Sequence, residues 1–317
     1  MPALPFPILS LPPKSRRIAL KCMDTLDLIN ISFTHPLAKR LAIELSVGIE
    51  VGSLRLLVRN GFKVFFSFYA PPHNIIADIS YLSADGETFD LIKDEDVLWI
   101  NSKIKLRDLL VDLLDVLHLR KLGEVSVHTS WDLILDELRG IEIHQLIVGE
   151  SITRQFKLLK LQAEELELNV PLTQADVICH NLHRIALKSP GNIQCEDLIG
   201  MNMMHIEVFM MFDHSSLTHR EINLFLLHWV KGSNPRMRYY RSPLQEPLQF
   251  EEQFVAQILK GIPHRAITPG ELEKLRVQFR GKTFQFRGYH IERNEGDAKA
   301  MISVDPWSPI VEVFVWF

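Results

Sequence analysis

Short apolar runs recur about every twenty residues along this chain from its middle onward, and this period constrains the fold more than any other feature. The runs are centred near Val127, Ile147, Leu168, Leu187 and Val208. Segments with helical spacing lie between them, at Trp131–Leu138 after Ser130, at Thr153–Leu161, after Thr173 and at Cys195–Ile199. A unit of one strand and one helix cannot bury its own apolar face, so neighbouring units must stack. The pattern therefore predicts an array of parallel strands joined by helices.

That spacing lies in the range of leucine-rich repeats, ~20–29 residues, although the Asn that usually follows the strand is not regularly present. We therefore expect a degenerate, leucine-rich-repeat-like array, and an ordinary parallel α/β sheet would show the same alternation. Alternate strand residues of such an array point outward onto one face. The candidate target-binding residues on this face are Ser126, His128, Glu165, Glu167, Arg184, Lys188, Glu207 and Phe209. A merely solvated face would have a similar composition.

A longer helix and a β meander follow the array. Thr218 and Glu221 have the spacing of a capping box, and Gly232 lies where a left-handed C-cap is expected. The apolar stripe of this helix consists of Ile222, Phe225, Leu226, Trp229 and Val230. An extended segment begins at Tyr239-Tyr240. Three further strands are predicted at Thr283–Arg293, Lys299–Val304 and Ile310–Trp316, with the first turn at Asn294–Asp297.

Residues 47–104 have the period of strands. Apolar and charged residues alternate at Leu54, Leu56 and Val58, and Asn60-Gly61 before Phe62–Tyr69 is a strong hairpin signal. A second ribbon is expected from Ile75–Leu82 and Glu87–Ile92, joined by Asp85-Gly86. The aromatic residues of Phe62–Tyr69 could stack on bases. They lack surrounding Lys and Arg, which favours a sheet core instead.

The first forty-six residues predict a small helical unit. One helix runs from Pro12-Pro13 to about Met23, a second opens with a capping box of Asp24 and Asp27, and a third starts at His35-Pro36. The third carries an apolar stripe at Leu37, Leu41 and Leu45. The unit is too small to bury all of its apolar residues, which include Ile8, Leu9, Leu11, Ile18 and Leu28. This surface must therefore meet a partner protein or the rest of the chain, as a simple helical cap would.

Three segments of this unit together resemble an F-box of the kind expanded in nematodes. They are Phe6-Pro-Ile-Leu-Ser-Leu-Pro, Arg17-Ile-Ala-Leu-Lys-Cys-Met-Asp and Leu26-Asp-Leu-Ile-Asn-Ile-Ser. The resemblance implies binding to a Skp-type adaptor and, through it, to a cullin in a ubiquitin ligase. The implied adaptor-binding residues are Pro7, Leu9, Leu11, Pro12, Ile18, Leu20, Leu28 and Ile31. The chain departs from the family at Thr25, where Pro usually follows Asp, and at Phe33-Thr34, where a Ser/Cys-rich stretch is usual.

Two segments near the other end are similar to the type 2 F-box-associated domain. They are Leu224-Phe-Leu-Leu-His-Trp-Val-Lys-Gly-Ser-Asn-Pro-Arg-Met and Ile291-Glu-Arg-Asn-Glu-Gly-Asp-Ala-Lys-Ala-Met-Ile. The resemblance implies a domain that binds a protein target and has no active site. We expect an F-box at 1–46, a β-hairpin region at 47–104 and an F-box-associated, leucine-rich-repeat-like domain with C-terminal strands at 105–317.

Charge and cysteine content exclude several functional classes. Lys and Arg number 35 against 39 Asp and Glu, a formal net charge of −4, which argues against a dedicated nucleic-acid binder. No apolar run approaches the ~18–20 residues that span a membrane, and the start has no basic segment typical of a secretory signal. Three cysteines are an odd number, which favours free thiols in a reducing compartment. We therefore expect an intracellular protein, cytoplasmic or nuclear, that binds neither nucleic acid nor membrane.

Catalytic motifs are missing from the sequence. Cys179, His180 and His183 are close in sequence, but no second Cys/His pair supplies a fourth metal ligand. There is no P-loop, nucleophile elbow or H-E-x-x-H pair. We expect no cofactor, no metal and no catalytic residue, and therefore a substrate-recognition subunit of a Skp–cullin–F-box ligase. A repeat-type scaffold without a ubiquitin role is the alternative, and an intracellular hydrolase or thiol enzyme is a third hypothesis.

Overall fold

The chain divides into two compact units, and each is described by itself. The structure is a computed structural model that describes residues 8–23, 25–46, 53–59, 63–69, 79–81, 90–93, 96–100, 105–128, 136–149, 162–169, 182–188, 195–209, 217–244, 251–278, 288–305 and 310–317. The first unit contains Met1–Leu146 with Lys160–Ala163, and the second contains Ile147–Leu159 with Glu164–Phe317. The predicted limits between residues 46 and 47 and between 104 and 105 both lie inside the first unit, and the three predicted domains stay a prediction.

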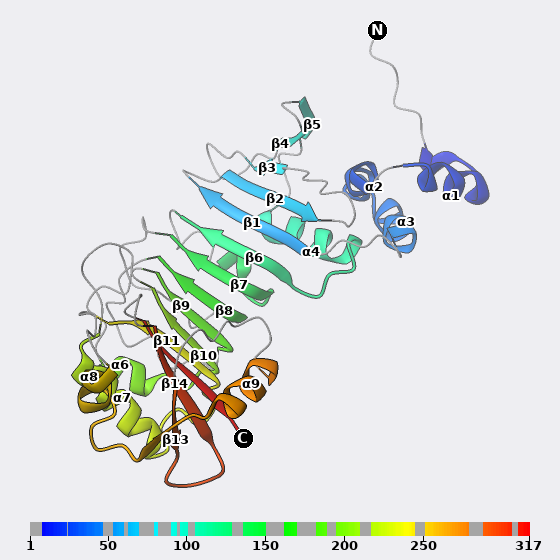
Figure 1. Ribbon diagram of the computed structural model, residues 1–317. Coiled ribbons are helices and arrows are strands. Elements are labelled where there is room, and N and C mark those ends of the chain that lie inside the picture. The colour runs from blue at the N-terminus through cyan, green and yellow to red at the C-terminus, as the bar shows by residue number, and fades with distance from the viewer. Residues whose placement is uncertain are drawn as a thin grey trace. The chain divides into compact units, whose positions relative to one another are not determined.

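Proline begins two of the three helices at the start of the first unit (Figure 1). After a 3₁₀ turn at Ile8–Ser10 (η1), α1 spans Pro13–Lys21, α2 spans Thr25–Ser32 and α3 spans Pro36–Ser46. A Pro at the first helical position loses no hydrogen bond, because the N–H there has no intrahelical partner. The three predicted helices are confirmed, whereas Asp24, the expected cap of the second, lies outside the described residues.

The sheet of the first unit is centred on β1, Ser53–Arg59. It pairs antiparallel with β2, Lys63–Tyr69, and parallel with β6, Leu122–Val127. Leu54, Leu56 and Val58 are buried as their alternation predicts. The antiparallel pairing predicted on either side of Asn60-Gly61 is confirmed, whereas the turn residues lie outside the described residues. The helix α4, Leu106–Val116, buries four leucines in its middle turns, namely Leu109, Leu110, Leu113 and Leu114. The strand β7, Glu142–Val148, pairs with β6 on the side away from β1.

The second predicted ribbon is wrong in its pairing. The strand β3, Ile79–Tyr81, pairs with β2, while β4, Asp90–Lys93, pairs with β5, Asp96–Ile100, in a separate two-stranded sheet. Lys93 and Asp96 are register partners only three positions apart. Closing such a short loop costs little entropy, and no strand signal in the sequence distinguishes this pairing from the predicted one.

Parallel strands dominate the first half of the second unit. They are β8, Gln162–Leu168, β9, Arg184–Leu187, β10, His205–Val208, and β11, Tyr239–Pro243. All five predicted strands of the array, from β6 to β10, are confirmed, and so is the helix α6 at Cys195–Gly200. The predicted helix at 131–138 is described only at 136–138, which are helical. The helices expected at 153–161 and after Thr173 lie outside the described residues.

The C-terminal meander extends this sheet. Its strands β13, Gly288–Glu292, β14, Lys299–Asp305, and β15, Ile310–Trp316, are antiparallel, and β15 pairs directly with β11. A short strand, β12 at His264–Ala266, adds the outer edge. The three predicted strands are confirmed within the described residues. The helices α8, Glu251–Gln257, and α9, Pro269–Gln278, have no counterpart in the prediction.

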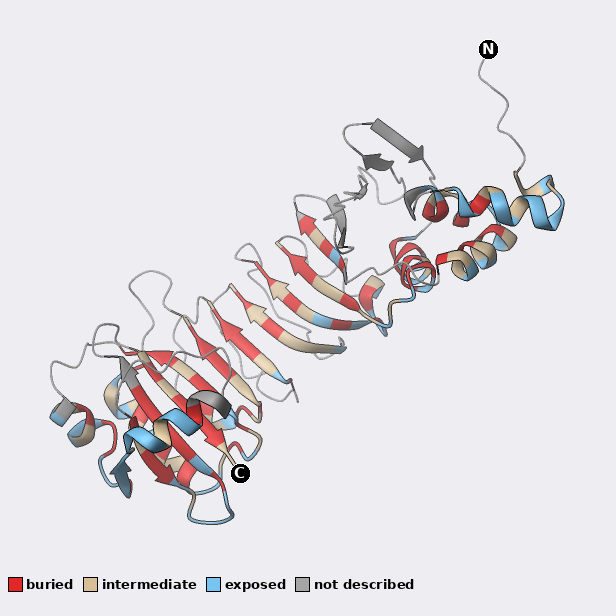
Figure 2. Cartoon of the chain, turned by 45° about the vertical axis from the view of Figure 1, so that its right-hand side comes forward, coloured by how far each residue is buried: buried red, intermediate tan, exposed pale blue. Residues whose placement is uncertain are grey.

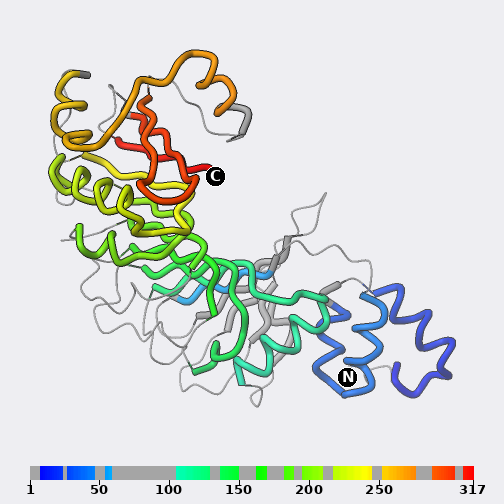
Figure 3. Tube along the Cα trace, turned by 90° about the horizontal axis from the view of Figure 1, so that it is seen from below, coloured from blue at the N-terminus to red at the C-terminus, as the bar shows by residue number. Residues whose placement is uncertain are grey.

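Helices cover both faces of the sheet in the second unit (Figure 3). The helix α7, His219–Val230, lies against Tyr240, whose ring centre is 4.5 Å from that of Phe225. On the other face, Leu275 of α9 belongs to a cluster with Tyr239, Met301 and Phe314. Tyr239 and Tyr240 are neighbours in one strand and therefore point to opposite faces. The alternation of buried and partly buried residues along these strands is visible in Figure 2.

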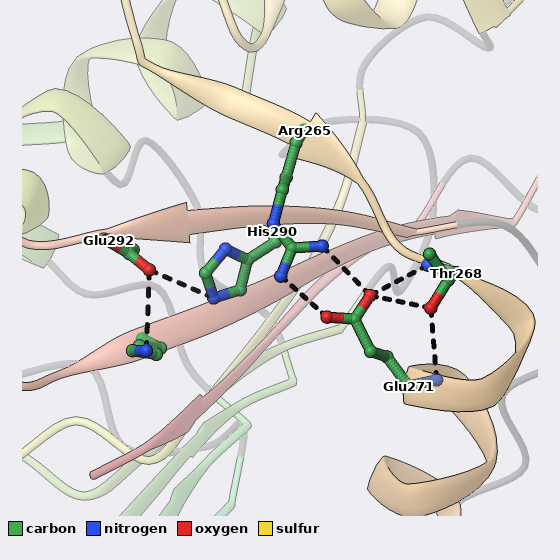
Figure 4. A network of polar contacts seen from close by, with 6 residues as sticks. Arg265, Thr268, Glu271, His290 and Glu292 are labelled. Carbon is green, nitrogen blue, oxygen red and sulfur yellow. Dashed lines mark hydrogen bonds and ion pairs between the residues drawn. The ribbon is translucent and has the colours of Figure 1, made fainter.

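The carboxylate of Glu271 fixes the start of α9 (Figure 4). It accepts hydrogen bonds from the backbone N–H and the hydroxyl of Thr268, and two more from the guanidinium of Arg265 at 2.7 and 2.9 Å. The Thr268 hydroxyl in turn accepts the N–H of Glu271 at 3.4 Å. This capping box therefore connects the helix to β12 as well as starting it.

Candidate functional site

Two surfaces of the described structure contain most of the residues that the sequence predicts to bind partners, one in each compact unit. We call the first the helical surface. We include in it nine of the exposed or half-buried apolar residues of η1 to α3, namely Ile8, Leu9, Leu11, Pro12, Ile18, Ile31, Leu37, Leu41 and Leu45. Ile18 is 57% exposed, which is high for so large an apolar side chain. Exposed apolar side chains on a small unit are typical of a protein-interaction site where they form a contiguous patch.

The helical surface exists because α3 buries its small residues instead of its large ones. Ala38, Ala42 and Ser46 recur every four residues and are buried. Leu37, Leu41 and Leu45, which the sequence identified as the apolar stripe, lie one position earlier and are only half-buried. Small side chains allow neighbouring helices to approach closely. The leucines are therefore left partly accessible on the flank of α3.

The predicted adaptor-binding residues divide into three groups. Leu9, Leu11, Pro12, Ile18 and Ile31 belong to the helical surface. Leu20 and Leu28 are 0% and 4% exposed and lie in the core of the unit. Pro7 lies outside the described residues. Their role as adaptor contacts stays a prediction, and it now concerns chiefly the first group.

Polar contacts hold α3 on α4 within the first unit. Lys39 Nζ lies 2.6 Å from Asp112 and 2.9 Å from Asp115. Burial alone would lower the pKa of Lys39, but the hydrogen bonds to these two carboxylates raise it. The Ser46 hydroxyl donates to the carbonyl of Val116 at 2.5 Å. The helices therefore keep a fixed arrangement on α4 while the helical surface stays accessible.

The second surface, which we call the sheet strip, consists of Glu165, Glu167, Arg184, Lys188, Glu207 and Phe209. Five of these residues are half-buried, whereas Glu207 is buried and therefore less accessible than the alternation predicts. Arg184 on β9 connects its neighbours: its guanidinium lies 3.1 Å from Glu165 on β8 and 3.1 Å from Glu207 on β10. Burial alone would lower the pKa of Arg184, but the contacts with Glu207 and Glu165 raise it. The alternation rule thus identified residues that the structure brings into contact.

Phe209 ends the sheet strip between two cations. Lys188 Nζ lies 4.1 Å from the centre of the Phe209 ring, and the guanidinium carbon of Arg241 lies 6.0 Å from it. Both distances suit cation–π attraction. Arg241 also lies 4.0 Å from Glu312, which accepts a hydrogen bond from Tyr239 at 2.8 Å. The sequence analysis did not identify Arg241, Glu312 and Tyr239 as site residues. Alternation along the strand from Tyr239 would have placed Arg241 on the same face.

Ser126 and His128 belong to the first unit and are described apart from the sheet strip. Ser126 is buried, and its hydroxyl lies 2.9 Å from Nε2 of His128. The Ser126 hydroxyl is therefore buried and bonded to His128, and it is less accessible than the alternation of β6 predicts. Their predicted role in target binding is not tested.

Reactive groups of the described residues do not assemble into a catalytic arrangement. Cys195 is buried, its thiol donates to the carbonyl of Glu221 at 3.2 Å, and burial together with Glu196 and Glu221 raises its pKa to about 12. Cys22 is exposed. Among the described residues there is no group of three or more His, Cys, Asp or Glu that could hold a metal. Cys179 and His180 lie outside them, so the expected absence of a metal at this motif stays a prediction.

A groove of about 780 Å³ lies between the start of α7 and the end of α8. His219, Arg220 and Lys260 give it a basic lining. Two backbone N–H groups at the start of α7 are used by the capping box, since Thr218 N donates to Glu221 at 2.8 Å and Glu221 N donates to the Thr218 hydroxyl at 3.2 Å.

Comparison with known proteins identifies part of the second unit. A family model described as F-box associated matches residues 174–241. The matched segment includes β9, α6, β10 and α7, and it therefore contains four residues of the sheet strip: Arg184, Lys188, Glu207 and Phe209. Searches of curated proteins and of solved structures found no match. Among the described helices, none combines the length and the apolar character needed to cross a lipid bilayer.

Proposed function

We propose that this chain is the substrate-recognition subunit of a Skp–cullin–F-box ubiquitin ligase. The observation that carries the proposal is the F-box-associated domain at residues 174–241, which lies in one chain with a three-helix unit that leaves aliphatic residues accessible. Residues 1–46 would be the F-box, of the nematode type, and the strands β6 to β10 a degenerate leucine-rich-repeat-like array. The chain itself would form and break no bond.

The adaptor would bind the helical surface. Leu9, Leu11 and Pro12 precede α1, and two hydrogen bonds from Arg16 to the carbonyl of Leu11, at 2.9 and 3.3 Å, fix the approach to that helix. Aliphatic side chains held on a rigid support lose little entropy when they enter a partner's groove. Leu20 and Leu28 would act from inside, by fixing the packing of the helices that carry the contact residues.

The target protein would bind the sheet strip. Its side chains are fixed by mutual contacts, as the two ion pairs of Arg184 show, and strands hold binding residues more rigidly than loops do. A target held here and a ubiquitin-conjugating enzyme recruited through the cullin would form one assembly. Modification is then accelerated by the high effective concentration of the two reactants. The proposal implies a cytoplasmic or nuclear location, where free thiols such as Cys22 and Cys195 persist.

Affinity purification with the Skp-type adaptor tests the first half of the proposal. We expect the wild-type chain to retain the adaptor in stoichiometric amounts. The double variant Leu11→Ala/Pro12→Ala should lose at least about 2 kcal/mol of binding free energy, roughly thirtyfold in Kd. Leu224→Ala is the matched control, because Leu224 is also partly exposed, at 38%, but lies on α7.

Equal retention of the adaptor by the double variant and the wild type would contradict the F-box assignment. A circular dichroism spectrum and a thermal unfolding curve for each variant separate lost binding from lost folding. A chain that captures other proteins but never the adaptor would point to the repeat-type scaffold. Deleting residues 1–45 should then leave the set of captured proteins unchanged.

The target-binding half is tested on Glu167. This residue lies on the sheet strip and is half-buried, and reversing its charge with Glu167→Lys leaves the ion pairs of Arg184 in place. We expect the proteins that co-purify with the wild type to be lost or reduced roughly tenfold, while the adaptor is retained. Glu142→Lys, an exposed charge reversal on β7, is the control. An unchanged set of co-purifying proteins would remove the strip from the proposal.

A further inference from the structure

The groove between α7 and α8, which lie side by side (Figure 1), is a separate site from the sheet strip. Helix α7 packs against Tyr240, whereas the strip lies on the face of Tyr239 and Arg241. The volume of the groove, about 780 Å³, is within the range of ligand sites, ~300–1,000 Å³. Helix α7 contributes Arg220, Asn223 and Leu227, and the end of α8 with the turn after it contributes Ala256, Gln257 and Lys260.

The described residues that line the groove include basic side chains and no acidic one. Arg220 on α7 and Lys260 after α8 are both exposed, so each side of the groove supplies one cation. No carboxylate among the described residues pairs with either of them. Arg184 and Arg241 on the other face differ, because each lies beside a carboxylate. Two cations without such partners around one hollow attract an anion.

Negative groups close to these two cations are already occupied. Asn223 Nδ2 donates to the carbonyl oxygens of Ile258 and Lys260 at 2.7 and 2.9 Å. Carbonyl oxygens after the end of a helix would otherwise repel an anion. The carboxylate of Glu221, next to Arg220 in the sequence, accepts hydrogen bonds from the N–H and the hydroxyl of Thr218 at 2.8 and 2.6 Å. The positive charge of the groove is therefore available to a ligand.

The rest of the lining suits a short stretch of peptide. Leu227 and Ala256 give the groove one apolar residue from each helix, and the carboxamide of Gln257 can donate to or accept from a peptide backbone. Arg220 and Leu227 are seven residues apart on α7, which at ~1.5 Å per residue is ~10 Å. About three residues of extended chain span this length. An inorganic anion would use the charged side chains alone.

We propose that this groove binds a short acidic peptide segment. Its carboxylates pair with Arg220 and Lys260, and an aliphatic side chain between them contacts Leu227 and Ala256. Two single cations from different elements match two separate carboxylates, whereas a phosphoryl group is recognised by several donors that converge on one point. Nucleic acid fits less well, because no aromatic residue is among the described lining. The site goes beyond the proposed function, since it needs neither the adaptor nor the sheet strip.

The test measures the Kd of the full chain for acetyl-Glu-Leu-Glu-amide by nuclear magnetic resonance. This peptide should bind roughly tenfold more tightly than acetyl-Gln-Leu-Gln-amide, the neutral peptide of the same shape. Raising the salt shortens the Debye length from ~30 Å at 0.01 M to ~8 Å at 0.15 M, so binding of the acidic peptide alone should weaken. The variant Arg220→Gln/Lys260→Gln should remove the difference between the two peptides.

Two controls keep the experiment decisive. Lys231→Gln/Lys274→Gln removes the same charge from exposed residues of the same unit outside the groove and should bind as the wild type does. The conservative variant Arg220→Lys/Lys260→Arg should also retain the preference for the acidic peptide. Arg220→Gln/Lys260→Gln should fold, because both side chains are exposed and a positive charge in the first turn of α7 does not stabilise the helix. A circular dichroism spectrum checks this.

Three results would overturn the acidic-peptide site. The first is an equal Kd of the wild type for the two peptides. The second is binding of inorganic phosphate as tight as that of the acidic peptide, because the groove would then recognise an anion alone. The third is an equal loss of binding in Lys231→Gln/Lys274→Gln, which would assign the attraction to overall charge. None of these results concerns the adaptor, and failure of the chain to retain the adaptor would leave the groove assignment standing.

Discussion

Gly232 adopts a backbone conformation that other residues avoid. It follows the C-cap of α7 with φ of +106°, and a Cβ built there would meet no atom within 4 Å. Any penalty for a larger residue is therefore one of backbone strain and not of packing. Its N–H donates to the carbonyl of Trp229 at 3.0 Å and ends the helix.

Gly232→Ala should consequently lower the free energy of unfolding by about 1–2 kcal/mol. Gly270→Ala is the matched control, since Gly270 lies in the first turn of α9 without a positive φ and with open space around it. That substitution should be neutral or stabilising by up to about 1 kcal/mol. Urea unfolding curves measure both, and equal effects of the two variants would contradict the strain argument.

The two described cysteines should differ in reactivity. The thiolate is the reactive form of cysteine, and burial with neighbouring Glu196 and Glu221 raises the pKa of Cys195 to about 12. Cys22 lies exposed after α1. We expect iodoacetamide near neutral pH to label Cys22 in the native chain and to label Cys195 only after unfolding. Peptide mass spectrometry distinguishes the sites, and native labelling of Cys195 would contradict its buried, protonated state.

At the scale of elements, α9 depends on a single carboxylate. Glu271 joins the capping box of Thr268 to the guanidinium of Arg265, and these contacts lower the pKa of Glu271 below its ordinary value of 4.5. A lowered carboxyl pKa stabilises the folded state at pH values above 4.5, and this contribution is lost as the pH falls further. Glu271→Gln should therefore loosen α9 at neutral pH.

Hydrogen exchange measures that effect directly. We expect faster amide exchange over residues 269–278 in Glu271→Gln, with exchange of α7 unchanged. Glu273→Gln is the control, because Glu273 is exposed on the same helix and is not part of the capping box. Equal protection of α9 in Glu271→Gln and the wild type would show that the apolar contacts of α9 with Tyr239, Met301 and Phe314 suffice to keep the helix folded.

Elements with strong local signals were predictable from the sequence, and those fixed by distant contacts were not. The capping box of Thr218 and Glu221 and the buried stripe of α7 are local, and both are confirmed. The pairing of β3 with β2, and of β15 with β11, depends on which edge is free when the chain collapses. The short strand β12 and the weakly amphipathic α9 have almost no periodic signal, so the sequence contained little to reveal them.

The candidate sites were predictable to a similar extent. Alternation in β8 to β10 selects the face of Glu165, Arg184 and Glu207, because a strand has only two faces. On a helix the choice is wider. Leu20 and Leu28 are buried and Leu37 is not, since the packing of α2, α3 and α4 decides which flank turns inward. No rule that reads one helix at a time contains that information.

Across the whole molecule, His290 makes stability depend on pH. The side chain is buried on β13, opposite Arg265 of β12, and its ring centre lies 5.6 Å from that of Trp316. Burial lowers the pKa of His290 from 6.5, and Arg265 and Lys299 lower it further, against the opposing effect of Glu292 and Glu271. The folded chain therefore takes up this proton less readily than the unfolded chain.

This difference fixes the sign of the pH effect. Above pH 6.5 the imidazole is neutral in both states, and below it the unfolded state binds more protons, so the free energy of unfolding falls as the pH decreases. One histidine contributes a slope of at most about 1.4 kcal/mol per pH unit. His290→Gln should flatten the dependence of the free energy of unfolding on pH below pH 6.5. A constant difference in this free energy between variant and wild type above pH 6.5 would report lost packing alone. Urea unfolding across this range gives both quantities, and a slope identical to that of the wild type would assign the acid sensitivity to other groups.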